Sequence, residues 1–145
     1  MTQLRNKNES LDINPTDVIM QRTIAKPIYI SGYGLLSGIK VNLEITPAKV
    51  GSGIIFERID IEPSIKIPAT INYASDQERR TRIEDAGFSI DTIEHLMSAF
   101  AGMGIDNALV KIDGPEVPCG DGSSLLFVKP IKEVGTVEQE QPRKI

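Results

Sequence analysis

The stretch DTIEHLMSAFAGMGIDNALVKI, residues 91–112, decides the fold, because in it a helical pattern is followed directly by a strand pattern. Asp91 is a favourable N-cap residue, and Glu94 follows three positions later, as in a capping box. Gly102 and Gly104 mark the end of the helix. The sequence therefore predicts a helix over Thr92–Met103 and a strand in the segment NALVKI that follows it.

Segments on either side of this stretch complete the predicted fold. Three earlier segments are short, rich in Ile and Val, and separated by Gly, Pro and Ser turn signals: Thr23–Ile30, Lys40–Thr46 and Gly53–Ile59. Apolar and polar residues alternate in the second of them, as in a half-buried strand. A second helix is expected over Ser123–Val134, kinked or interrupted by Pro130. Strands followed by a few helices predict an α+β fold, a two-layer sandwich of a mainly antiparallel sheet packed with two helices.

The chain of 145 residues is long enough for one domain with a sizeable core. Residues 1–20 are polar and show no sustained period, so we interpret them as a flexible leader. The folded unit is predicted over residues 21–136. The charged segment 137–145 is interpreted as a tail or as the start of an interdomain linker.

Composition narrows the possible environment and partners. The chain is 40% hydrophobic and 25% charged, which is typical of a globular protein. Its net charge of -4 argues against a nucleic-acid partner. No apolar run approaches the roughly 18 residues of a transmembrane segment, and the chain does not open with a signal-peptide pattern. Cys119 is the single cysteine, which fits a reducing compartment, so we expect a cytoplasmic protein.

The predicted helix carries two residues with catalytic potential, Glu94 and His95. Glu94 can simply be a capping carboxylate, and His95 a core or surface histidine without a chemical role. Alternatively, a Glu beside a His at a helix start places a general base next to a metal ligand. A catalytic zinc usually takes three protein ligands, whereas this chain has one histidine and one cysteine. The residues alone therefore do not justify a zinc site.

The same helix has two faces at its period of 3.6 residues. The apolar face, predicted to lie on the sheet, consists of Ile93, Leu96, Met97 and Phe100. The opposite stripe consists of His95, Ser98, Ala99 and Gly102. Small residues allow another backbone to approach closely, so the stripe is a predicted contact face for a helix or a partner domain.

The loop PEVPCGDGSS, residues 115–124, is the second cluster of interest. Asp121 and the glycine after it can form a turn, with a following serine capping the next helix. The alternative is that Asp121 orients a ligand or a neighbouring imidazole. A nucleophilic pair of Cys119 and His95 has no triad signature, and we do not favour it.

Two segments stand out together: IDTIEHLMSAFAGMGIDNALVKIDGPEVPCGDGSS, residues 90–124, and QRTIAKPIYISGYGLLSG, residues 21–38. They resemble the zinc-dependent UDP-3-O-acyl-N-acetylglucosamine deacetylases of lipid A biosynthesis. The resemblance extends in order over residues 21–145. It implies the first of two similarly folded α+β domains, with an active site between them that hydrolyses an amide of a UDP-linked acyl-glucosamine.

The resemblance also implies roles for three residues. Glu94 falls on the general base that activates the zinc-bound water, and His95 falls on one of three zinc ligands. Asp121 matches the aspartate of the loop near the site, with a substrate-binding or orienting role. The other ligands belong to the second domain, so the isolated chain is predicted to be inactive.

Three positions depart from the family pattern. Leu36 stands where the opening motif commonly has a histidine, the segment ERRTRIED at Glu78–Asp85 is bulkier and more charged than usual, and Leu126 replaces a proline. Two functional hypotheses remain open. The chain is half of a deacetylase whose second domain is on another chain, or it is an inactive single-domain relative that binds a protein partner or a second copy of itself. A truncated reading frame is the third possibility.

Overall fold

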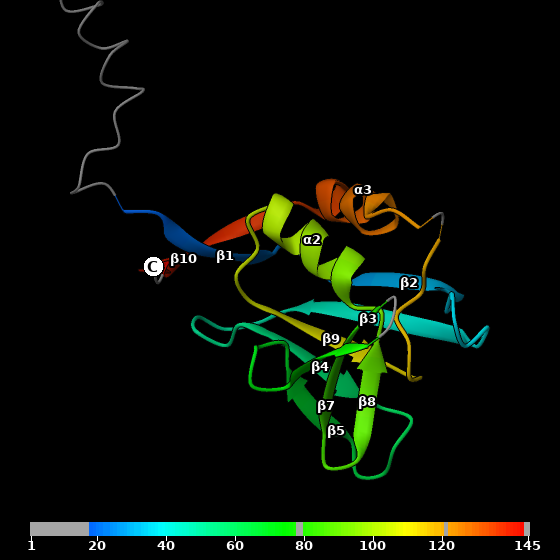
Figure 1. The fold of residues 1–145 in the computed structure, drawn as a ribbon. Coiled ribbons are helices and arrows are strands. Elements are labelled where there is room, and N and C mark those ends of the chain that lie inside the picture. Colours follow the sequence, from blue (N-terminus) through cyan, green and yellow to red (C-terminus); the bar gives the residue numbers. More distant parts are fainter. Residues whose placement is uncertain (1–17, 78–79, 121, 144–145) are drawn as a thin grey trace, which may run out of the picture.

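The computed structural model describes residues 18–77, 80–120 and 122–143. Its central sheet has five strands, and two helices cover one of its faces (Figure 1). In spatial order the strands are β2 (Ile28–Tyr33), β3 (Lys40–Pro47), β9 (Ala108–Ile112), β4 (Ile54–Arg58) and β5 (Ile65–Pro68). The helices are α2 (Glu94–Gly102) and α3 (Leu125–Val134). All neighbouring strands are antiparallel except β9 and β4, which confirms the predicted α+β class.

Two smaller antiparallel sheets extend this unit. One contains β6 (Ala74–Gln77), β7 (Arg80–Asp85) and β8 (Phe88–Asp91), and the other pairs β1 (Met20–Ile24) with β10 (Thr136–Pro142). The fold therefore has several sheets where the sequence predicted one. The single strand predicted over Thr23–Ile30 is wrong, because the segment forms two strands, β1 and β2. Pro27, which has no N–H group to donate to a neighbouring strand, lies in the interruption between them.

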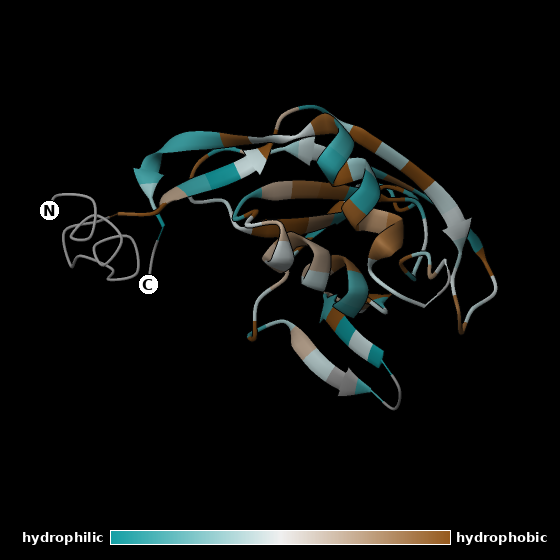
Figure 2. Ribbon diagram, turned by 90° about the horizontal axis from the view of Figure 1, so that it is seen from above, coloured by the Kyte–Doolittle hydropathy of each residue, from teal (hydrophilic) through white to brown (hydrophobic). Residues whose placement is uncertain are grey.

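The core lies between the central sheet and the helices. The predicted alternation in β3 is confirmed, since Val41, Leu43 and Ile45 are buried. Register places Ile45, Val110, Phe56 and Ile67 in one row across β3, β9, β4 and β5. Phe100 of α2 and Phe127 of α3 are also fully buried. Hydrophobic residues gather in the central strands, whereas β1 and β10 are mostly hydrophilic (Figure 2).

The predicted start of the first helix is wrong. The helix begins at Glu94, Ile93 occupies the N-cap position without a side-chain cap, and Asp91 is the last residue of β8. Strand pairing places Asp91 opposite Arg82, and the resulting ion pair engages the carboxylate that was expected to cap the helix. Thr92 lies between strand and helix with a left-handed φ of 63°. The second helix is confirmed and continues through Pro130.

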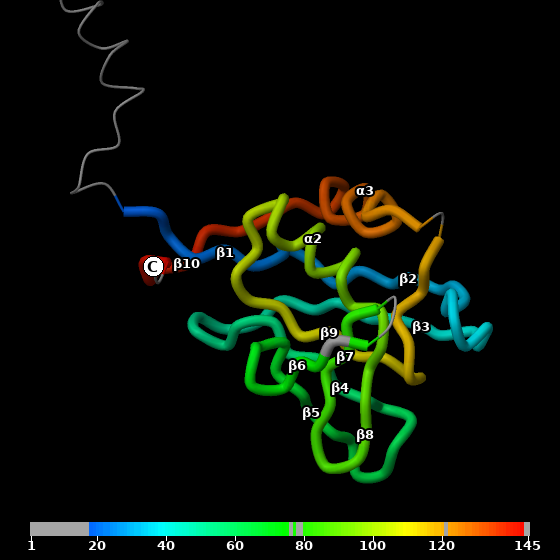
Figure 3. Tube along the Cα trace, in the orientation of Figure 1, coloured from blue at the N-terminus to red at the C-terminus, as the bar shows by residue number. Residues whose placement is uncertain are grey.

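The two ends of the described chain run side by side as β1 and β10 (Figure 3). Most of the predicted leader lies outside the described residues, and Met20 already belongs to β1. The segment interpreted as a tail or linker contains most of β10, while the domain limits 21–136 stay a prediction. Within the described ranges, no helix is long and apolar enough to cross a membrane.

Candidate functional site

Glu94 and His95 occupy the first turn of α2, and both side chains are half-buried. Oε1 of Glu94 lies 3.5 Å from the backbone nitrogen of Thr81 in β7, a long hydrogen bond. Within the described part of the chain, the His95 imidazole takes part in no hydrogen bond or ion pair. Because both side chains are only half-buried, part of the carboxylate residue and part of the imidazole residue stay exposed at the start of α2.

Strand β7 anchors the start of this helix. The carbonyl oxygen of Thr81 accepts hydrogen bonds from the backbone nitrogens of Thr92, at 2.9 Å, and Ile93, at 3.4 Å. The strand's residues Arg80 and Arg82 both pair with Asp91 at the end of β8. The hydrogen bond to Asp91 raises the pKa of Arg82 above its ordinary value. The charged segment singled out in the sequence is thus partly neutralised within the protein, and its Glu78 lies outside the described residues.

Glu116 is the residue of this region that the sequence analysis missed. Its side chain is only 2% exposed, and it accepts hydrogen bonds from the Thr92 hydroxyl at 2.6 Å and from the Ser37 backbone nitrogen at 2.8 Å. The backbone nitrogen of Leu36 lies 3.2 Å from both carboxylate oxygens. Burial raises the pKa of Glu116, but these hydrogen bonds outweigh burial and hold the pKa below its ordinary value. Glu116 is therefore a charged group inside the protein that joins three separate segments.

A signal for Glu116 was present in the sequence. The residue lies in the run GPEVP, where it is the only charged side chain among apolar and small residues. A carboxylate in such surroundings is buried only when several donors surround it. Gly34 supports the arrangement, because a Cβ atom there would collide with the Glu116 carboxylate.

The helix face opposite the core differs from the predicted stripe. Ala99 is 1% exposed and belongs with Leu96 and Phe100 to the buried face, so its place in the stripe was wrong. The reason is that Ala99 and Phe100 follow Leu96 by three and four residues, which is the spacing of one face of a helix, and this face is the buried one. Ser98 and Gly102 are exposed, which leaves them on the open side of α2 with the half-buried His95.

Cys119 is buried, and its backbone nitrogen bonds to the carbonyl oxygen of Tyr33. Buried structural cysteines are usually inert, so the burial of Cys119 does not favour a cysteine nucleophile. Asp121 lies outside the described residues. The roles of Glu94, His95 and Asp121 all stay predictions.

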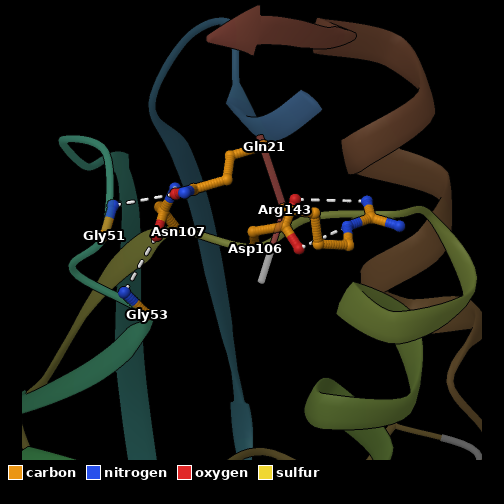
Figure 4. A pocket seen from close by; sticks show the side chains of 6 residues that line it. All are labelled: Gln21, Gly51, Gly53, Asp106, Asn107 and Arg143. Carbon is orange, nitrogen blue, oxygen red and sulfur yellow. Dashed lines mark hydrogen bonds and ion pairs between the residues drawn. The ribbon is translucent and has the colours of Figure 1, made fainter. Parts of the chain in front are cut away.

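A second polar cluster lies beyond the C-terminal end of α2 (Figure 4). It surrounds a cavity of about 200 Å³ lined by Gln21, Gly51, Gly53, Asp106, Asn107 and Arg143. Its polar groups bind one another: Asn107 accepts a hydrogen bond from the Gly53 backbone nitrogen at 2.9 Å, and Asp106 pairs with Arg143 at 2.8 Å. Because these contacts tie β1 and β10 to the loops beside them, we assign the cluster to stability.

Comparison with known proteins shows to which family the chain belongs. Residues 21–145 match the family described as UDP-3-O-acyl N-acetylglycosamine deacetylase. The chain belongs to this family. It is 45% identical over 128 residues to the UDP-3-O-acyl-N-acetylglucosamine deacetylase of Shewanella violacea, covering 88% of this chain and 42% of that protein.

Other deacetylases of the family give the same result. The protein of Myxococcus xanthus is 45% identical over 125 residues, or 86% of this chain and 40% of the relative. The protein of Shewanella baltica is 44% identical over 128 residues. The chain thus spans about two fifths of the length of these deacetylases.

The donor atoms of the chain can be compared with what zinc requires. The described residues contain no group of three or more His, Cys, Asp or Glu side chains able to hold a metal ion. His95 offers one imidazole, whereas a catalytic zinc usually has three protein ligands. The described residues of this deacetylase-family chain therefore fit one part of a zinc site but do not form a complete one.

Proposed function

We propose that the chain is the N-terminal half of a zinc-dependent UDP-3-O-acyl-N-acetylglucosamine deacetylase that acts in lipid A biosynthesis in the cytoplasm. The observation that carries the proposal is the first turn of α2, where Glu94 and His95 are consecutive, half-buried residues and no residue of the described ranges hydrogen-bonds to the His95 imidazole. Membership of the family supports it. The roles proposed for both residues are those that the family resemblance implies.

In the proposed reaction, water adds to the acetamide carbonyl of the UDP-linked acyl-glucosamine, the C–N bond breaks, and acetate and a free amine result. Glu94 accepts the proton of the attacking water and returns a proton to the departing amine. His95 supplies one ligand for zinc, which when bound acts as a Lewis acid. Asp121 is proposed to orient the substrate or the imidazole.

A second domain is required because one imidazole cannot hold catalytic zinc by itself. We propose that a second deacetylase domain supplies the other ligands. The open side of α2, formed by His95, Ser98 and Gly102, is the face on which the ligands must converge. The isolated chain is expected to be inactive for this reason.

The test is complementation with a relative. The chain is mixed with zinc and with the separately produced C-terminal part of the Shewanella violacea deacetylase, and acetate release from the UDP-linked substrate is measured. Activity is expected only when both parts are present, and Glu94→Gln is expected to lower it roughly 10²-fold or more. An inactive mixture, beside a fused control that works, would refute the proposal that this half and a second deacetylase domain together form the active site.

The alternative is a catalytically inactive relative that binds a protein partner or a second copy of itself. It is favoured by the apolar Leu36, whose side chain is 46% exposed where the family commonly has a histidine. Sedimentation of the purified chain distinguishes the two hypotheses. A monomer at all concentrations, together with activity in the mixture, would exclude the self-associating module.

A further inference from the structure

The start of α2 depends on an unusual backbone conformation at Thr92. A β-branched residue in the left-handed region is rare, because its side chain crowds the backbone there. This residue is the single link between β8, which ends at Asp91, and the N-cap residue Ile93. The direction in which Glu94 and His95 leave the strand is therefore set at Thr92.

Interactions hold Thr92 on two sides. Its backbone nitrogen donates to the carbonyl oxygen of Thr81 at 2.9 Å. Its hydroxyl donates to Oε2 of Glu116 at 2.6 Å, and both residues are buried. A short hydrogen bond to a buried carboxylate is among the stronger polar interactions in proteins, so it can compensate the strained backbone.

Glu116 is itself held in place by two independent attachments. Its own segment is bonded to β8, since the Asp91 backbone nitrogen donates to the Pro115 carbonyl at 2.8 Å and the Val117 nitrogen donates to the Asp91 carbonyl at 3.0 Å. Its carboxylate also caps the turn that contains Leu36 and Ser37. The Glu116 carboxylate therefore connects the 34–37 turn to Thr92, the residue before the N-cap.

We propose that Glu116 is a positioning residue, which holds the Glu94 and His95 pair in place through the Thr92 hydroxyl and couples it to the turn at Leu36. The proposal rests on the proposed function for its catalytic meaning. Glu116 does not touch the reacting atoms, because its oxygens are engaged by Thr92, Leu36 and Ser37. Its effect on the reaction is transmitted by the orientation of the helix start.

Three variants separate positioning from simple stability. Glu116→Gln keeps the size of the side chain and removes its charge, Thr92→Val keeps the β-branched shape and removes the hydroxyl, and Thr92→Ser retains the hydroxyl. Ile67→Val is the control, because Ile67 is buried in β5, at the opposite edge of the sheet from β2. It perturbs the core without touching the Glu116 contacts.

The first measurement uses the isolated chain and does not depend on activity. Amide hydrogen exchange and ¹H–¹⁵N spectra are recorded for the wild type and each variant. In Glu116→Gln, exchange at the Leu36 and Ser37 amides should rise roughly tenfold, as expected when a charged acceptor is lost. The Glu94 and His95 signals should shift in Glu116→Gln and Thr92→Val but not in Thr92→Ser or Ile67→Val.

The second measurement uses the chain mixed with zinc and the C-terminal part of the Shewanella violacea deacetylase. For Glu116→Gln and Thr92→Val, kcat should fall roughly 10- to 100-fold, the usual effect of losing an orienting contact. For these two variants KM should stay at the wild-type value. Thr92→Ser, which retains the hydroxyl, should keep the wild-type kcat. Loss of stability alone would lower kcat equally in Ile67→Val.

Distinct outcomes separate the two proposals. Unshifted Glu94 and His95 signals in both Glu116→Gln and Thr92→Val would overturn the positioning role, as would a kcat equal to that of the Ile67→Val control. A wild-type mixture without activity would remove the proposed function alone, because the amide measurement would still decide the positioning role. If Glu116→Gln fails to fold, the comparison of Thr92→Val with Thr92→Ser decides.

Discussion

Replacing Asn107 by alanine should destabilise the protein far more than replacing an asparagine on its surface. Asn107 is 1% exposed, and its side chain accepts a hydrogen bond from the Gly53 backbone nitrogen at 2.9 Å (Figure 4). It also donates hydrogen bonds to Gln21 at 2.9 Å and to Gln139 at 2.8 Å. Each is worth about 1 kcal/mol net, so the free energy of unfolding should fall by roughly 3 kcal/mol. For a domain of this size the melting temperature should fall by roughly 10 °C.

The assay is thermal unfolding followed by circular dichroism, with urea unfolding for the free energy. The matched control is Asn42→Ala, since Asn42 also makes side-chain hydrogen bonds, to Ser31 and Asp113, but lies exposed in β3. Its effect should stay within about 0.5 kcal/mol, as for most surface substitutions. Equal losses in the two variants would refute the view that this cluster ties β1 and β10 to the rest of the fold.

Three further outcomes follow from the same structure. The purified chain should retain no stoichiometric zinc after dialysis; one tightly bound equivalent, lost in His95→Ala, would instead show that the isolated chain or a second copy completes the site. Since the folded-state pKa of Glu116 is lowered, its contribution to stability is present above the unfolded pKa and is lost as pH falls through the folded pKa. Urea unfolding in the acid range should therefore show a smaller loss for Glu116→Gln than for the wild type, and equal losses would contradict that role. Phe100→Ala should cost about 3–5 kcal/mol in thermal unfolding, whereas Ser98→Ala on the exposed face of the same helix should change stability by less than about 0.5 kcal/mol. A large effect of Ser98→Ala in the isolated chain would mean that this face is already packed.

Local patterns in the sequence were sufficient for the elements with strong hydrophobic periodicity. The segments predicted as strands at Lys40–Thr46 and Gly53–Ile59 correspond to β3 and β4, and the second helix was also correct. Strands β6 to β8 were not assigned, because few of their side chains are buried. Ile83 and Ile90 are buried there, and they face each other only after β7 and β8 have paired.

The first turn of α2 shows why local reasoning failed at the candidate site. Asp91 and Glu94 have the spacing of a capping box, and that pattern predicted their roles from nearest neighbours alone. In the structure Asp91 pairs with Arg82, and Glu94 faces the backbone of Thr81. Residues of β7 bind both carboxylates in place of the helix terminus. A pattern of neighbouring residues cannot predict this, because β7 meets the helix start only in the folded chain.

The sequence by itself determined the family, the α+β class and the adjacency of Glu94 and His95 on one helix, because motif spacing and hydrophobic periodicity are properties of neighbours along the chain. Only the tertiary structure decided that Ala99 is buried, that β1 pairs with β10, and that Glu116 lies under the helix start. The contact between Thr92 and Glu116 joins residues 24 positions apart, and β1 and β10 come from opposite ends of the described chain. Their free energy comes from burial and hydrogen bonding across the fold, which a linear pattern does not record.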